Sequence, residues 1–140
     1  MSGLSIAASA TLLAWSIGSG NVSTAPVAKP AEIVNVSLSG EGGGSISIKL
    51  DRSLVPAGPV SFHVTNEAIS QTHEFIIVAL ASPGEGLPYH AGKERVVESK
   101  IRHLAEVADL KPGASETLSL MLRPGAYVLI CNRESHYVPA

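Results

Sequence analysis

The chain has 140 residues, a length that fits one domain, and it carries a formal net charge of −2 and a single cysteine. A slightly acidic balance without clusters of Lys and Arg argues against nucleic acid as a partner and against anionic membrane surfaces. One cysteine excludes an internal disulfide, so a domain of about 110 residues after the first 30 must bury its core without covalent cross-links.

The first 28 residues contain no Asp, Glu, Lys or Arg, and residues 4–18 among them read LSIAASATLLAWSIG. This run is too short and too rich in Ser and Thr for a transmembrane helix, but it suits the apolar region of a secretory signal peptide. No basic residue precedes it, and small residues offer two cleavage sites, near Gly18 and near Ala25. We therefore expect residues 1–30 to be a signal peptide or a flexible leader.

This leader predicts that the protein is exported to a periplasmic or other extracytoplasmic location. An uncleaved N-terminal anchor and a misjudged start are the alternatives. Beyond such an anchor we expect no transmembrane span.

Residues 31–140 show short runs in which apolar and polar residues alternate, separated by turns rich in Gly and Pro. The runs EIVNVSLS, SISIKL, VSFHVTN and ETLSLML each place every second side chain on one apolar face. HEFIIVAL is more continuously apolar, as expected of a strand covered on both faces, and AYVLIC forms the last strand. The pattern predicts a single all-β domain, an antiparallel sandwich or barrel.

One segment departs from this pattern. Residues 82–105 read SPGEGLPYHAGKERVVESKIRHLA, a polar stretch without alternation. Val97, Ile101 and Leu104 recur at helical spacing. We therefore predict a short helix near residues 94–104, in an insertion that covers one face or edge of the sandwich.

Two strand ends carry metal-ligating side chains. Cys131 ends the last apolar run on the same side as Leu129, and His136 follows it after a loop of four residues. His73 opens HEFIIVAL on the same side as Phe75, so it also points inward. One thiolate and two imidazoles that converge in an apolar setting form the trigonal set that holds blue copper, whereas magnesium and calcium require oxygen ligands.

Residues 31–140 resemble the cupredoxin family, the small blue copper proteins of the plastocyanin and azurin type. The resemblance rests on VPAGPVSFHVTN, THEFIIV, LKPGASETLSLMLRPGAYVLICN and the Cys-x4-His spacing of CNRESH. It implies a Greek-key β-sandwich in which His73, Cys131 and His136 bind one type 1 copper ion. It further implies one-electron transfer with redox protein partners, and a tyrosine corner at Tyr127 that pins the turn before the last strand. We expect a monomer.

The chain departs from the family pattern at the axial ligand. The family has a methionine, usually the fifth residue after the second histidine, and here that position would be 141, one past Ala140. Met1 lies in the leader, and Met121 alternates out of phase with the leucines beside it, so it should face away from the core. Either the sequence is cut one residue short or the site has three ligands, with the carbonyl of Thr72 as a candidate weak axial contact.

Several other polar residues have two interpretations. Glu74 and Asn132 each follow a ligand and could hydrogen-bond across the site, where they would hold the two strand ends together; the alternative is that both face solvent. His63, His90 and His103 are expected at the surface.

The sequence shows no general base paired with a nucleophile and no second histidine cluster of the kind that a multicopper oxidase needs. We therefore predict an electron carrier with no catalytic residues, not an enzyme. Two alternatives remain: an envelope protein that binds and delivers copper, and a metal-free β-sandwich interaction module in which Cys131 is only a buried apolar side chain.

Overall fold

The structure, a computed structural model, describes residues 2–6, 25–42 and 46–137. Its longer strands are β1 (Ser2–Ile6), β2 (Glu32–Ser39), β3 (Ser47–Leu50), β4 (Gly58–Asn66), β5 (His73–Leu80), β8 (Arg102–Leu110), β9 (Ser115–Leu122) and β10 (Gly125–Ile130). Two two-residue strands, β6 (Tyr89–His90) and β7 (Arg95–Val96), and two 3-10 turns, η1 (Ala91–Lys93) and η2 (Glu98–Lys100), lie between β5 and β8.

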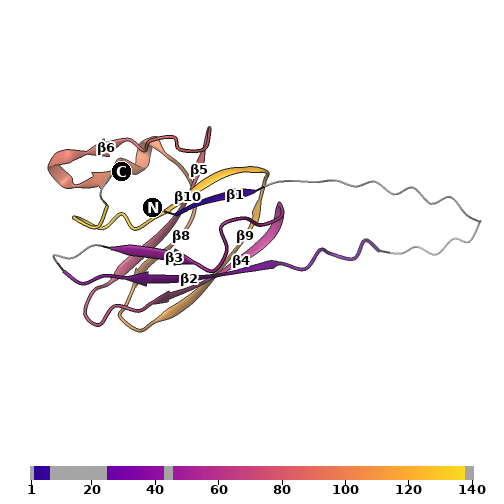
Figure 1. Cartoon of the computed structure of the whole chain (residues 1–140), viewed down its shortest axis with the longest axis horizontal. Coiled ribbons are helices and arrows are strands. Elements are labelled where there is room, and N and C mark those ends of the chain that lie inside the picture. Colours follow the sequence, from indigo (N-terminus) through magenta and orange to yellow (C-terminus); the bar gives the residue numbers. More distant parts are fainter. Residues whose placement is uncertain (1, 7–24, 43–45, 138–140) are drawn as a thin grey trace, which may run out of the picture.

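The long strands form two four-stranded sheets that pack face to face (Figure 1). One sheet has the order β1-β10-β5-β8 and the other has the order β3-β2-β4-β9. Side chains from both sheets fill the space between them, and the rings of Phe62 and Phe75 meet there with centroids 5.7 Å apart. The predicted all-β sandwich is therefore confirmed at the level of its two layers, although β2 and β4 pair in parallel rather than antiparallel.

Alternation in the sequence places the core as expected. In β2, Val34, Val36 and Leu38 are buried between the sheets while Asn35 is exposed. The same holds in β4, where three apolar side chains are buried and His63 is exposed. Because successive side chains of a strand point to opposite faces, one buried face fixes the register of each strand.

The predicted helix is wrong. The one helical turn within residues 94–104 is η2; β7 lies before it, and β8 already begins at Arg102. Leu104 belongs to β8 and is 44% exposed, so its helical spacing from Val97 and Ile101 reflects no shared helical face. The segment before β8 is instead a hairpin, in which β6 pairs antiparallel with β7. We call residues 89–98 the insertion hairpin.

The expectation that this insertion covers a face of the sandwich is confirmed. A second apolar cluster, separate from the main core, joins the outer sides of β5 and β10 to the insertion, and it consists of Ile76, Val78, Val96, Val128, Ile130 and Tyr137. Figure 1 shows the insertion hairpin on the side of the β5–β10 sheet that faces away from β2 and β4. HEFIIVAL is continuously apolar because its two faces lie in two different cores.

The turn before the last strand has the predicted tyrosine corner. The Tyr127 hydroxyl donates a hydrogen bond of 2.6 Å to the carbonyl oxygen of Arg123, four residues upstream. The Tyr127 ring is buried in the main core. This contact ties the start of β10 to the turn and so fixes the position of the strand that leads to Cys131.

The predicted leader lies mostly outside the described residues. Of its described part, Ser2–Ile6 form β1, which pairs antiparallel with β10, and residues 25–30 are exposed without regular secondary structure. Among the described residues, no helix has the length and apolar character needed to cross a bilayer. The signal-peptide assignment remains a prediction.

Candidate metal centre

The three predicted ligands come together at one end of the sandwich. His73 is the first residue of β5, and Cys131 directly follows β10, its antiparallel neighbour, so the start of one strand lies beside the end of the other. The pairing of β5 with β8 shifts register between His73 and Phe75, a local irregularity that re-aims side chains near a site. His136 lies in the segment that follows Cys131. We call residues 131–137 the ligand loop.

Their ligating atoms converge on one point. The Cys131 Sγ atom is 3.8 Å from Nδ1 of His73 and 3.4 Å from Nδ1 of His136. One ligand atom from each residue lies within 4.8 Å of the other two, and the two imidazole rings have centroids 5.1 Å apart. Among the described residues, these three form the group that could hold a metal ion.

This geometry fits a bound metal. A metal bonded to sulfur at about 2.3 Å and to nitrogen at about 2.0 Å, with an angle between tetrahedral and trigonal, holds these two atoms about 3.6 Å apart. The two observed sulfur–nitrogen separations lie on either side of that value. The site therefore has the spacing of a metal centre with one thiolate and two imidazole ligands.

A backbone carbonyl fixes the orientation of His73. Its Nε2 lies 3.1 Å from the carbonyl oxygen of Gly40, the residue directly after β2. Because a carbonyl can only accept, Nε2 carries the proton and Nδ1 presents its lone pair toward Cys131. Gly40 has φ of 125°, a conformation that favours glycine, so the residue type at this position suits the turn that supplies the carbonyl. A hydrogen bond to the outer ring nitrogen is the common way to orient a metal-binding imidazole.

Cys131 is almost fully buried, and its sulfur accepts a hydrogen bond. The backbone N–H of Glu74 donates to Sγ at 3.3 Å. Burial raises the pKa of the Cys131 thiol above its ordinary value of 9.0, while the backbone N–H groups of Arg133 and Glu74 act in the opposite direction. Without a metal the thiol therefore keeps its proton at neutral pH, and a metal ion would have to displace it.

His136 differs in its exposure. It is half-buried, whereas His73 is fully buried. Burial lowers the pKa of the His136 imidazole below its ordinary value of 6.5, and the nearby His73 lowers it further. It is therefore neutral at pH 7 and ready to offer a lone pair.

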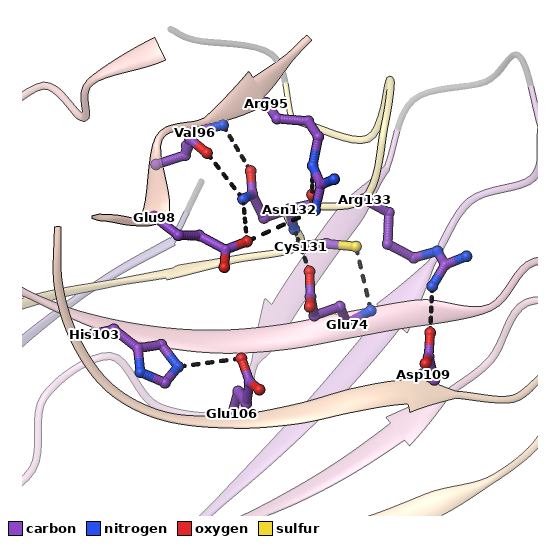
Figure 2. A network of polar contacts seen from close by, with 10 residues as sticks. All are labelled: Glu74, Arg95, Val96, Glu98, His103, Glu106, Asp109, Cys131, Asn132 and Arg133. Atoms are coloured by element: carbon purple, nitrogen blue, oxygen red, sulfur yellow. Dashed lines mark hydrogen bonds and ion pairs between the residues drawn. The ribbon is translucent and has the colours of Figure 1, made fainter. Parts of the chain in front are cut away.

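Of the two interpretations of Glu74 and Asn132, the contact across the site is the one that the structure shows. The backbone N–H of Asn132 donates to Oε2 of Glu74 at 3.2 Å, so the residues that follow two of the ligands are joined directly (Figure 2). Burial, followed by the charge of Glu98, raises the pKa of the half-buried Glu74 carboxyl. Together with the bond from Glu74 N–H to Sγ, this contact fastens the end of β10 to the start of β5.

The remaining expectations about single residues are mostly confirmed. Met121 is 70% exposed on β9, so it faces away from the core as predicted. His63, His90 and His103 are exposed, and His103 contacts Glu106 at 3.2 Å. An axial contact from the Thr72 carbonyl remains a prediction.

Two contacts in the site could not be predicted from sequence patterns. The Gly40 carbonyl belongs to the first residue of GEGGGS, a run whose composition shows only that the chain reverses direction. Asn132 is fully buried and bonds to Val96 in the insertion hairpin, far away in the chain. Contacts between a side chain and a distant backbone follow no sequence period, so only the folded arrangement reveals them.

No family model matches the chain, and no curated protein or solved structure matches it either. The resemblance to cupredoxins therefore stays a prediction that rests on the motifs quoted above.

Proposed function

We propose that this protein binds one type 1 copper ion through His73, Cys131 and His136 and serves as an exported one-electron carrier. The observation that carries the proposal is the convergence of one cysteine Sγ and two histidine Nδ1 atoms at the buried end of two paired strands. The uncharged apolar leader supports export.

The ligand set favours copper over other common metals. Thiolate and imidazole are too soft to suit magnesium or calcium. A closed structural zinc site takes four protein ligands, whereas the described part of the chain brings three of these side chains to this point; zinc with three protein ligands keeps its fourth position for water. Two histidines and one cysteine are the trigonal set of blue-copper electron-transfer sites.

The surroundings suit a carrier more than a catalyst. Copper, when bound, supplies a one-electron change between its cuprous and cupric states. Strand pairing and the hydrogen bonds from Glu74 and to Gly40 hold Cys131 and His73 in place, so these ligands need to move little when the charge changes. His136 lines a surface pocket with Gln71 and Ser135, and neither His73 nor Cys131 lines that pocket. The imidazole of His136 is thus the ligand through which an electron would enter or leave.

Titration of the purified, metal-free protein with Cu(II) tests this proposal. We expect one equivalent to bind and to produce strong visible absorption from charge transfer between thiolate and copper. Cys131→Ser should abolish this colour, because a serine hydroxyl is not ionised at neutral pH and offers no soft ligand. A protein that takes up no copper, or that keeps undiminished colour after Cys131→Ser, would refute the proposal.

A second measurement separates a carrier from a delivery protein. A carrier should undergo reversible one-electron reduction while it retains the metal, and its copper should leave slowly when a chelator is added. Rapid transfer of cuprous copper to a chelator would instead favour the delivery function.

A further inference from the structure

The insertion hairpin is attached to the ligand loop next to both of the loop's metal ligands. Asn132 follows Cys131, while Ser135 and Tyr137 stand on either side of His136. The Ser135 hydroxyl donates to the carboxylate of Glu94. The ring of Tyr137 packs against the ring of Tyr89, with centroids 5.7 Å apart and planes inclined by 44°.

Asn132 forms the centre of this attachment (Figure 2). Its Oδ1 accepts from the backbone N–H of Val96 at 2.7 Å, and its Nδ2 donates to the Val96 carbonyl at 3.1 Å. The amide therefore pairs with the backbone of β7 as a neighbouring strand would. Nδ2 also donates to Oε1 of Glu98 at 2.6 Å.

The backbone of Asn132 is held as well. Its carbonyl accepts from Nε of Arg95 at 2.8 Å, and its N–H donates to Glu74. Arg95 and Glu98 also lie 3.7 Å apart as an ion pair. Every polar group of Asn132 thus has a partner, and its side chain is fully buried.

We infer that Asn132 is a positioning residue for the metal centre: it fastens the ligand loop to the insertion hairpin and so sets where Cys131 Sγ and His136 Nδ1 lie before any metal binds. This inference rests on the proposed function, because the consequence that matters is the geometry offered to copper. The pair of bonds to Val96 is the decisive feature, since a buried amide satisfied on both sides holds a backbone in one place.

The alternative is that Asn132 only stabilises the fold. The two roles differ in what a substitution changes. A structural role affects the stability of the whole domain, whereas a positioning role also changes the geometry of the ligands and the rate at which copper leaves. The test therefore needs a readout at the metal as well as a readout of the loop.

Asn132→Ala is the main variant. It should raise amide hydrogen exchange over residues 131–137 of the metal-free protein by about tenfold or more, because the loop loses three side-chain hydrogen bonds, two of which are buried. It should also speed the loss of copper to a chelator by about 10- to 100-fold and alter the copper hyperfine splitting in the electron paramagnetic resonance spectrum.

Asp109→Asn is the matched control. Asp109 pairs with Arg133 of the same loop at 2.5 Å, but both side chains are well exposed, at 68% and 40%. An exposed ion pair contributes little. Asp109 also has φ of 50°, which asparagine tolerates. This variant should match the wild-type protein in all three measurements.

A reciprocal pair tests the chemistry of the contact. Asn132→Asp removes the amide donor and places a carboxylate against the carboxylate of Glu98, so it should loosen the loop. Adding Glu98→Gln restores a donor on the other side of the contact and should recover part of the loss. Should Asn132→Ala fail to fold, Arg95→Ala combined with Glu98→Ala weakens the same attachment at exposed side chains and is judged by the same criteria.

The outcomes separate this inference from the proposed function. Copper uptake by the wild-type protein, with Asn132→Ala unchanged in exchange, copper release and spectrum, would overturn the positioning role alone. Faster exchange with copper release and spectrum unchanged would also overturn it, because Asn132 would then serve only the fold. A wild-type protein that takes up no copper would overturn the proposed function and this inference together.

Discussion

The two histidines of the site reach the same sulfur from very different surroundings. His73 is fully buried at the first position of a paired strand, and the Gly40 carbonyl holds its outer ring nitrogen. His136 is half-buried in a loop that contacts the insertion hairpin through Asn132 and, on either side of His136, through Ser135 and Tyr137.

The difference shows how one site can combine rigidity with access. Strand pairing and burial hold His73 and Cys131 together, and this half of the site requires the sandwich itself. His136 depends on the ligand loop and on the insertion hairpin that supports it. We therefore expect substitutions in the first half to affect folding, and substitutions in the second half to affect mainly the metal.

Replacement of each histidine by alanine in the metal-free protein should give the largest contrast. His73→Ala removes a fully buried ring and leaves the Gly40 carbonyl without its partner, so the free energy of unfolding should fall by about 2–4 kcal/mol. His136→Ala removes a half-buried ring and should lower it by less than about 1 kcal/mol. Urea denaturation followed by circular dichroism measures both, and equal losses would contradict the proposed division of the site.

The proton that copper displaces should come from the Cys131 thiol. Burial raises the pKa of Cys131, whereas the pKa of His136 is lowered, so at pH 7 the thiol is protonated and this imidazole is not. Copper affinity should therefore rise by about tenfold per pH unit between about pH 7 and pH 9, with one proton released for each copper bound. Competition titrations against a chelator of known pH dependence measure the slope, and a flat profile would mean that the thiolate forms before the metal arrives.

External imidazole should distinguish the two histidines at the metal. His136→Gly leaves a gap beside a surface pocket, so added imidazole should enter and restore most of the copper colour. His73→Gly leaves its gap in the buried interior, and imidazole should restore little there. Equal recovery in both variants would show that His73 is as accessible as His136.

The half of the site built on strands could be predicted from the sequence. Side chains alternate along β5 and β10, so His73 and Cys131 take the same buried face as Phe75 and Leu129. The spacing of His136 from Cys131 predicts it as the third ligand. These local patterns are sufficient because side chains along a paired strand alternate between the two faces of the sheet, so a residue's position in the strand decides which face it takes.

The support for His136 could not be predicted in the same way. A helical period fits Val97, Ile101 and Leu104, but this segment forms no helix. Instead, the backbone of Val96 pairs with the Asn132 side chain of the ligand loop. A polar segment with weak periodicity takes its conformation from whatever it packs against, and here that surface is built from the outer side chains of β5 and β10. The conformation of the insertion hairpin therefore cannot be predicted without the positions of β5 and β10.

The tyrosine corner at the opposite end of β10 offers the smallest and most selective test. Tyr127→Phe keeps the buried ring and removes only the hydroxyl that donates to the Arg123 carbonyl. We expect the free energy of unfolding to fall by about 1 kcal/mol, because one hydrogen bond is lost and the apolar packing is kept. The copper spectrum and the rate of copper loss should stay unchanged, because the hydrogen bonds around Cys131 come from Glu74 and the ligand loop rather than from this turn. Thermal unfolding and visible absorption of the same sample measure both effects. An altered copper spectrum would show that the position of Cys131 depends on the whole length of β10, and not only on the contacts at its own end.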